Sequence, residues 1–347
     1  MRELDAKTRL ACLDGIRGVL AVFVALSHAY SHFTGWGSGY NFFRNATFAV
    51  DIFFILSGIV LYHNYQLKIK NGMVKEFLLS RFLRLYPLHI IAMMLIPLSL
   101  FISTGNAFPG WTLQPTFLRF FSDLLLLNNF SGLVAFLNPP TWSISSELFV
   151  GSIVVIACCF RFYLAILIIV SSLLIMLLTS FKSNDIVTPI MSIISGGMLR
   201  CAFCISLGVI AYKIALYIQE DSLLFRAIDR TSIYALFTVI ALMVGLRLTV
   251  PQYVVITAAL SVYIAVMSMN KSSVSWLLNS EPLKELGFRS YSIYLLHTPV
   301  IYLFIGFKSE NLSHNVFFAT LSIILTIYIS KFTSRYIEKP FIDIGKR

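Results

Sequence analysis

Repeated apolar runs, each long enough to cross a lipid bilayer as a helix, constrain the fold of this chain more than any other feature. A hydrocarbon core about 30 Å thick needs about 20 mostly apolar residues per helix. We expect about ten such spans, near residues 14–33, 46–63, 85–103, 142–160, 162–180, 197–217, 231–248, 251–269, 290–307 and 315–333. Apolar residues make up 58% of the chain and charged residues 12%, whereas a soluble domain carries about a quarter charged residues. The sequence therefore predicts an all-α, polytopic transmembrane helical bundle and excludes soluble, disordered and coiled-coil classes.

The distribution of basic residues predicts how this bundle is oriented. The formal net charge is +11, which in a soluble protein would suggest a nucleic-acid partner, but here the basic residues gather in alternate loops and at both termini. The remaining loops carry few of them, namely Arg44, Arg119, Lys182, Arg247 and Lys308. Because basic loops stay on the cytoplasmic side, we expect cytoplasmic N and C termini, contact with membrane lipids and no nucleic-acid partner.

We expect the chain to form a single transmembrane domain over 1–347, with its longest outer loop at 104–141. This loop contains four prolines and an amphipathic stretch at 116–130. Such a segment is expected to lie in the membrane interface or to cap a cavity.

The first span carries ionisable residues, which are costly inside a membrane and therefore mark functional sites by default. Asp14 and Arg17 are three residues apart on a helix and can pair, either as a neutralised helix end or beside a ligand. His28 is suited to move a proton near neutral pH, although a purely structural histidine is the alternative. His28 and His32 share a helical face, but two histidines without a further ligand make a weak metal site, so we expect no metal.

Two carboxylates also fall inside expected spans, Asp51 in the second and Glu147 in the fourth. Each should face the bundle interior or a hydrated cavity. A carboxylate near His28 could orient the imidazole and stabilise its charged form, as the third group of a catalytic triad does. The alternative is a polar clamp between helices, in which the carboxylate bonds a serine or an arginine.

Charged clusters lie at the cytoplasmic ends of two other spans. Arg81 and Arg84 are three residues apart, on one helical face, where their forked donors suit a phosphate; the alternative is an anchor for lipid headgroups. The charged segment 335–339, near the C terminus, is expected to be a solvated helix end.

Taken together, ordered motifs along the chain resemble the integral-membrane acyltransferase family 3. The motifs are the 14–18 DGIRG opening with His28 downstream, the 50–58 VDIFFILSG stretch, Arg81 and Arg84 before the 86–87 YP pair, the 142–143 WS pair with Glu147, the 291–297 YSIYLLH stretch and the 338–341 EKPF stretch. The resemblance implies a membrane-bound O-acetyltransferase in a bacterial inner membrane, in the stand-alone form without an SGNH-type esterase-like domain.

The same resemblance implies an acetyl-CoA donor bound on the cytoplasmic side. By this analogy Arg17, Arg81 and Arg84, with Asp14, are expected to surround the coenzyme. The acceptor is expected to be a carbohydrate hydroxyl, or a lipid-linked glycan, on the outer side, as in the O-acetylation of O-antigen, lipopolysaccharide or capsule.

The catalytic residues implied are His28, Glu147 and Asp51. His28 either deprotonates the acceptor hydroxyl with the support of Glu147 or Asp51, or it carries the acetyl group as an acetyl-imidazole, and the sequence leaves both routes open. A different class of function uses the same buried groups as a proton relay: a proton-coupled transporter or flippase for a lipid-linked sugar.

Overall fold

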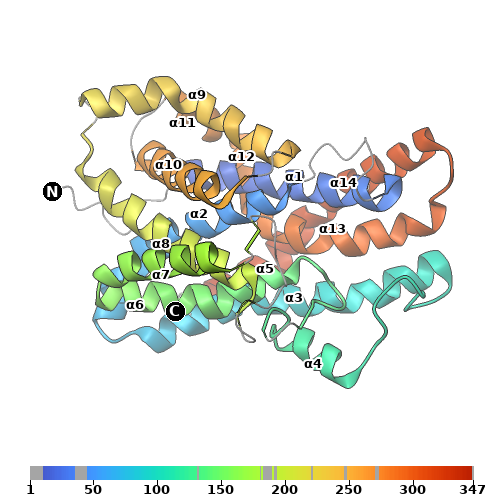
Figure 1. The fold of residues 1–347 in the computed structure, drawn as a ribbon. Helices are drawn as coiled ribbons and strands as arrows, with labels where there is room; N and C mark the ends of the chain where they lie inside the picture. Colours follow the sequence, from blue (N-terminus) through green and yellow to red (C-terminus); the bar gives the residue numbers. More distant parts are fainter. Residues whose placement is uncertain are drawn as a thin grey trace.

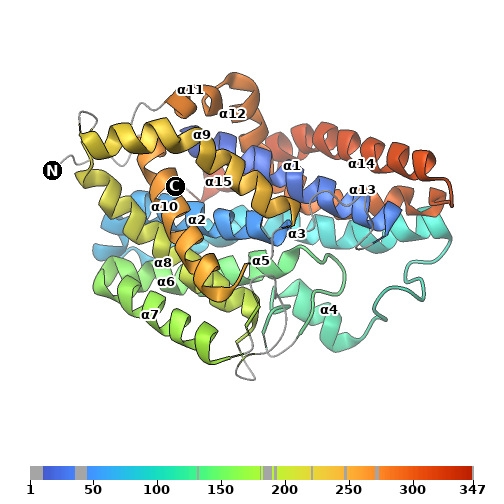
Figure 2. The same ribbon diagram turned by 45° about the horizontal axis from the view of Figure 1, so that its top comes forward.

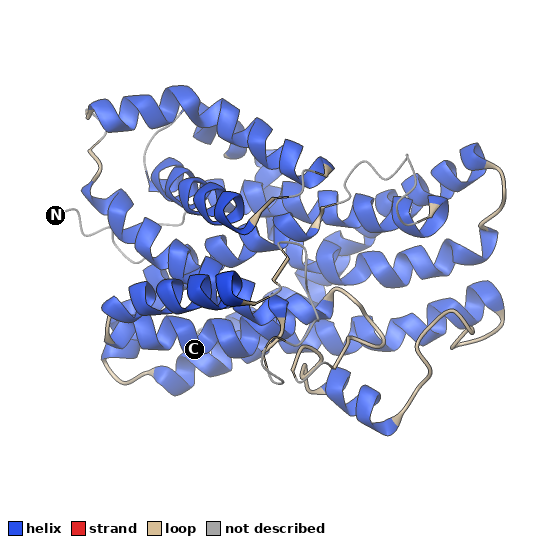
Figure 3. Ribbon diagram, viewed as in Figure 1, coloured by secondary structure: helices blue, strands red, loops and turns tan. Residues whose placement is uncertain are grey.

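The computed structural model describes residues 11–35, 45–130, 133–179, 181–182, 190, 194–219, 222–245, 248–269 and 273–345. Within these ranges the regular elements are helices, joined by loops without a strand (Figure 3). In chain order they are α1 (Ala11–Thr34), α2 (Thr47–Lys70), α3 (Val74–Thr104), α4 (Phe117–Leu124), α5 (Thr141–Ser146), η1 (Glu147–Gly151), α6 (Ser152–Phe160), α7 (Tyr163–Leu178), α8 (Gly196–Tyr217), α9 (Leu223–Val244), α10 (Val250–Met269), α11 (Ser273–Leu278), α12 (Glu281–Phe288), α13 (Ser290–Phe304), η2 (Ile305–Phe307), α14 (Leu312–Thr333), η3 (Ser334–Glu338) and α15 (Lys339–Ile344). The prediction of an all-α helical membrane bundle is confirmed. Residues 1–10, which contain part of the basic N terminus, lie outside the described ranges.

Every expected span corresponds to a helix, but not every helix reaches the expected length. Among the described residues, nine helices are long and apolar enough to cross a membrane. The fifth expected span, 162–180, forms α7 of 16 residues, which is about 24 Å long at 1.5 Å per residue. It is short because the backbone is extended rather than helical at Arg161, before the helix, and at Thr179, after it.

Consecutive long helices run in opposite directions through the bundle, and α7 takes its place in this alternation (Figure 1). As a result α1 begins and α14 ends at the same end of the bundle, as an even number of crossings requires. Figure 2 shows α4 at the periphery, apart from the long helices.

The loop between α3 and α5, which we expected on the outer side, is folded back onto the helices. The Asp123 carboxylate accepts hydrogen bonds from the backbone N–H groups of Phe136, at 3.0 Å, and Leu137, at 2.6 Å. Burial raises the pKa of Asp123, whereas these N–H donors lower it. The Asn138 amide donates to the Leu295 carbonyl at 3.0 Å. That carbonyl needs a donor because Pro299, four residues later in α13, has no N–H to offer it.

Helices α2 and α8 approach each other backbone to backbone. A Cβ atom on Gly58 would lie 2.3 Å from the Ile205 carbonyl oxygen, and one on Gly208 would lie 2.3 Å from the Ile55 carbonyl oxygen. Only glycine permits this distance at both crossing points, which is how small residues let membrane helices pack closely.

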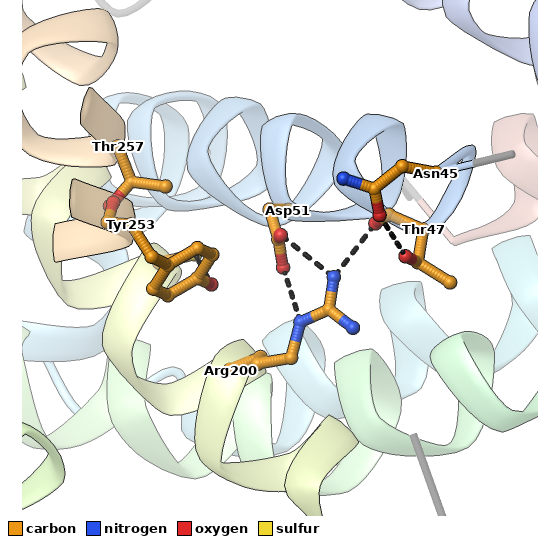
Figure 4. A network of polar contacts seen from close by, with 7 residues as sticks. Asn45, Thr47, Asp51, Arg200, Tyr253 and Thr257 are labelled. Carbon is orange, nitrogen blue, oxygen red and sulfur yellow. Dashed lines mark hydrogen bonds and ion pairs between the residues drawn. The ribbon is translucent and has the colours of Figure 1, made fainter. Parts of the chain in front are cut away.

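An ion pair joins the same two helices (Figure 4). Arg200 of α8 donates to both carboxylate oxygens of Asp51, from Nε at 2.9 Å and from Nη2 at 2.7 Å. Nη2 also donates to the Thr47 carbonyl at 2.9 Å. Both charged side chains have no exposed surface. Asp51, expected as a candidate catalytic residue, is thus held in a clamp between helices, with Tyr253 of α10 beside it (Figure 4).

We expect the substitution Asp51→Leu to lower the free energy of unfolding by about 3–5 kcal/mol, because it leaves the Arg200 charge buried and unneutralised. The double substitution Asp51→Leu/Arg200→Met removes both charges and should lose much less. Thermal and denaturant unfolding of the purified protein in detergent measures the difference. A double variant as unstable as the single variant would contradict the role of the pair in neutralising charge.

Cysteine labelling tests the predicted orientation, since all five native cysteines are buried. We expect a membrane-impermeant maleimide to label Gly110→Cys in intact cells and Lys70→Cys only after lysis. Both positions are exposed, and the unsubstituted protein reports the background. Labelling of Lys70→Cys in intact cells would reverse the orientation.

Candidate functional site

A cavity with about 580 Å³ of empty space lies among α1, α2, α3, α5 and α13. Its polar lining consists of Arg17, Ser57, Arg84, Ser143, Glu147, Ser290, Tyr291 and Tyr294. The arginines expected to act together, Arg17 of the first span and Arg84 of the third, therefore line the same cavity.

Arginines dominate one part of this cavity. Arg17 of α1 and Arg84 of α3 both line it. Arg81 instead turns toward Glu147, donating from Nη2 to Oε1 at 3.0 Å and to the backbone carbonyl at 3.2 Å. The Ser57 hydroxyl donates to the same Oε1 at 2.8 Å. Glu147 is thus bonded to Arg81 and also acts electrostatically on Arg17 and Arg84. Arg17 and Arg84 line the cavity, where their donors suit an anionic ligand.

Asp14 lies one turn before Arg17 on α1 and acts on it electrostatically. The glycines beside these residues serve helix packing. A Cβ atom on Gly15 would lie 2.3 Å from the Leu278 carbonyl oxygen, and one on Gly18 would lie 2.6 Å from the Gly287 backbone nitrogen. The close approach at this motif is therefore made by the backbone of α11 and α12.

Glu338 adds a second carboxylate to the region, and the expectation of a solvated helix end is wrong for this residue. It is 6% exposed, because the π-helical turn η3 carries it inward from the end of α14. The Ser292 hydroxyl donates to its Oε1, and the Thr333 hydroxyl donates to Ser292 at 2.8 Å. The Tyr291 hydroxyl donates to the Leu85 carbonyl, which fastens α13 to α3 next to the arginines.

His28 meets a second histidine. Its Nδ1 lies 2.8 Å from Nε2 of His297, and the ring centroids are 5.0 Å apart. His297 has no exposed surface. The expected supporting carboxylates are held by arginines instead, Asp51 by Arg200 and Glu147 by Arg81. The sequence contained a signal for His297, an ionisable residue inside a span two positions before Pro299, but no indication that it faces α1.

The cavity and the histidine pair adjoin through Tyr294. This residue lines the cavity, and its ring centroid lies 6.0 Å from that of His297. Its hydroxyl is 2.8 Å from the Ser143 hydroxyl and donates to the Pro140 carbonyl at 3.1 Å. Arg17 and His28 are eleven residues apart on α1, about 16 Å along the helix. The cavity and the histidine pair therefore form one region, with Arg17 and Arg84 at one end and the imidazoles of His28 and His297 about 16 Å away along α1.

His32 lies one turn beyond His28 and makes an edge contact with Tyr302, with ring centroids 5.3 Å apart. In the part of the chain that the structure describes, no three His, Cys, Asp or Glu side chains are grouped as a metal site would require.

Comparison with known proteins identifies the family. The family model described as "Acyltransferase domain" matches residues 10–334. A protein named "Protein 2 in picA locus" from Rhizobium radiobacter is 43% identical over 90 residues, which cover 25% of this chain and 44% of that protein. "Acyltransferase MdmB" from Streptomyces mycarofaciens is 30% identical over 147 residues, which cover 40% of this chain and 36% of that protein.

The chain spans less than half the length of these two curated relatives. No solved structure matches it. The family match covers nearly the whole chain and includes every residue of the arginine-lined cavity and the histidine pair. This multi-pass membrane protein therefore belongs to the acyltransferase-domain family.

Proposed function

We propose that the protein is a membrane O-acetyltransferase. It takes an acetyl group from acetyl-CoA on the cytoplasmic side and transfers it to a hydroxyl of an exported carbohydrate, such as O-antigen or capsule, in a bacterial inner membrane. The observation that carries the proposal is the order of groups along one region, from Arg17 and Arg84 through the cavity and Tyr294 to the His28–His297 pair.

The arginines supply the part of the site that a coenzyme A donor needs. Coenzyme A is polyanionic at its nucleotide end and neutral along its pantetheine arm, with the thioester at the tip. Guanidinium groups bind phosphates through paired donors. Phosphates at Arg17 and Arg84 would direct the arm along the cavity, and the 16 Å rise of α1 from Arg17 to His28 is about the depth the thioester has to reach.

The histidine pair supplies the acid–base chemistry. In a ternary complex His28 accepts the proton of the acceptor hydroxyl while the oxygen attacks the thioester carbonyl. The new C–O bond forms, the C–S bond breaks, and the departing thiolate of coenzyme A takes the proton back from the imidazolium. In the covalent route the His28 ring nitrogen attacks the thioester carbonyl, the C–S bond breaks and the thiolate of coenzyme A leaves. The acceptor hydroxyl then attacks the acetyl-imidazole, the N–C bond breaks, and the hydroxyl proton passes to the freed imidazole or to the thiolate.

We expect Arg17→Ala and Arg84→Ala each to weaken acetyl-CoA binding by about ten- to a hundredfold, since a lost bond to a charged group costs about 1.5–3 kcal/mol. Arg84→Lys should recover only part of the loss, because lysine cannot form a fork. Titration calorimetry in detergent measures the affinity. Arg226→Ala, at an exposed position on α9, is the matched control and should bind normally. Wild-type affinity in both site variants would disprove the assigned coenzyme site.

We expect His28→Ala to fold and to bind acetyl-CoA, yet to lose acetyl transfer by at least about 10²–10⁴-fold, the contribution of a general base. The assay supplies radiolabelled acetyl-CoA and total glycolipid to the purified protein. His32→Ala should show a much smaller loss. If the wild-type protein puts no label on carbohydrate, the proposed acetyltransferase activity is contradicted and a transporter of lipid-linked sugar is favoured. Equal loss of activity in the His28 and His32 variants would restore the interpretation of the two histidines as a metal pair.

A further inference from the structure

The hydrogen bonds around His297 determine which of its two nitrogens carries a proton. Its Nδ1 faces the carbonyl oxygen of Ile293, one turn earlier in α13, at 3.3 Å. A carbonyl oxygen only accepts hydrogen bonds. The proton of His297 therefore resides on Nδ1.

The tautomer of His28 follows from that of His297. A charged imidazole is costly inside a membrane bundle, so each ring carries a single N–H in the resting protein. With its proton on Nδ1, His297 presents a lone pair at Nε2, and the 2.8 Å contact to His28 Nδ1 then requires His28 Nδ1 to be the donor. The lone pair of His28 is consequently on Nε2.

We propose that His297 is a positioning residue that fixes His28 in its Nδ1–H tautomer, so that Nε2 of His28 is the nitrogen that accepts the hydroxyl proton or the acetyl group. This inference rests on the proposed acetyltransferase function. It extends the function by assigning the reactive atom and the residue that selects it. A neutral imidazole, His297, then has the orienting role that we had expected of a carboxylate.

The same contact stabilises the transferred proton. Once Nε2 of His28 accepts a proton, the ring is positively charged, and its Nδ1–H bond to His297 becomes charge-assisted and stronger. The Ile293 carbonyl in turn accepts the Nδ1–H of His297, so the chain of hydrogen bonds from His28 through His297 supports the positive charge. The charge needed for catalysis thus forms only during turnover, and no resting carboxylate has to be kept ionised beside the pair.

Two residues just before His297 in α13 hold it in place. Tyr294, one turn earlier, is bonded to Ser143 and to the Pro140 carbonyl. Leu295 is bonded through its carbonyl to Asn138. These contacts fix the rotation of α13, and with it the direction of the His297 ring toward α1.

Two substitutions separate a hydrogen-bonding role from a packing role. His297→Leu introduces an apolar side chain of similar size and removes the hydrogen-bond acceptor. His297→Gln places an amide oxygen near the position of Nε2. We expect His297→Leu to lower kcat by about 10²–10⁴-fold, with the KM for acetyl-CoA and its Kd unchanged. His297→Gln should recover a large part of kcat. Equal kcat in the leucine and glutamine variants would overturn the proposal, as would a leucine variant that retains wild-type kcat.

A spectroscopic measurement tests the tautomer without relying on turnover. In protein labelled with ¹⁵N-histidine, the signals of His28 are those missing from His28→Gln. We expect them to report a proton on Nδ1 in the wild-type protein and a shift toward Nε2–H in His297→Leu. A wild-type His28 protonated on Nε2 overturns the inference even if His297 is required for activity.

The two measurements also distinguish this inference from the proposed function. A wild-type protein that transfers no acetyl group removes the proposed function, while the nitrogen spectra still decide the tautomer. A wild-type protein that transfers acetyl and depends on His28, but tolerates His297→Leu, removes only the inference.

Discussion

Each charge inside this bundle has to be neutralised by the protein itself, because the surrounding lipid offers neither water nor counterions. The Asp51–Arg200 pair meets this requirement where α2 and α8 touch backbone to backbone. The Arg81–Glu147 pair meets it beside the cavity. The need to neutralise buried charge therefore shapes both the helix packing and the site. Arg17 and Arg84, which line the cavity, are neutralised in part through space by the carboxylates of Asp14, Glu147 and Glu338.

The sequence predicted the helices and the residues that meet in the cavity better than it predicted their partners. Span length and basic loops follow from local composition, and the arginines were identified by motif. Pairing is a property of packing: Asp51 and Arg200 are 149 positions apart in sequence, and no periodicity relates them. Arg200 nevertheless gave a signal, because an arginine deep in an apolar span requires a carboxylate, and Asp51 was one of few available inside spans.

The same limit explains the two residues that sequence reasoning placed least well. Glu338 belongs to a charged segment typical of a solvated helix end, and only the π-helical turn η3 carries it inward to Ser292. His297 lies in a span, but its role depends on which face of α13 meets α1. The π-turn sets the position of Glu338, and the packing of α13 sets that of His297. Neither is encoded in hydropathy.

The bond from Asn138 to Leu295 makes the loop between α3 and α5 part of the hydrogen bonding of α13. Loops diverge between relatives more than the elements that they connect. Here such divergence is constrained, since a loop that loses its amide at this position leaves an unpaired carbonyl two residues from His297. The loop and the alignment of the imidazoles are thus inherited together, and a chimera that exchanges the loop has to exchange the proline-containing helix with it.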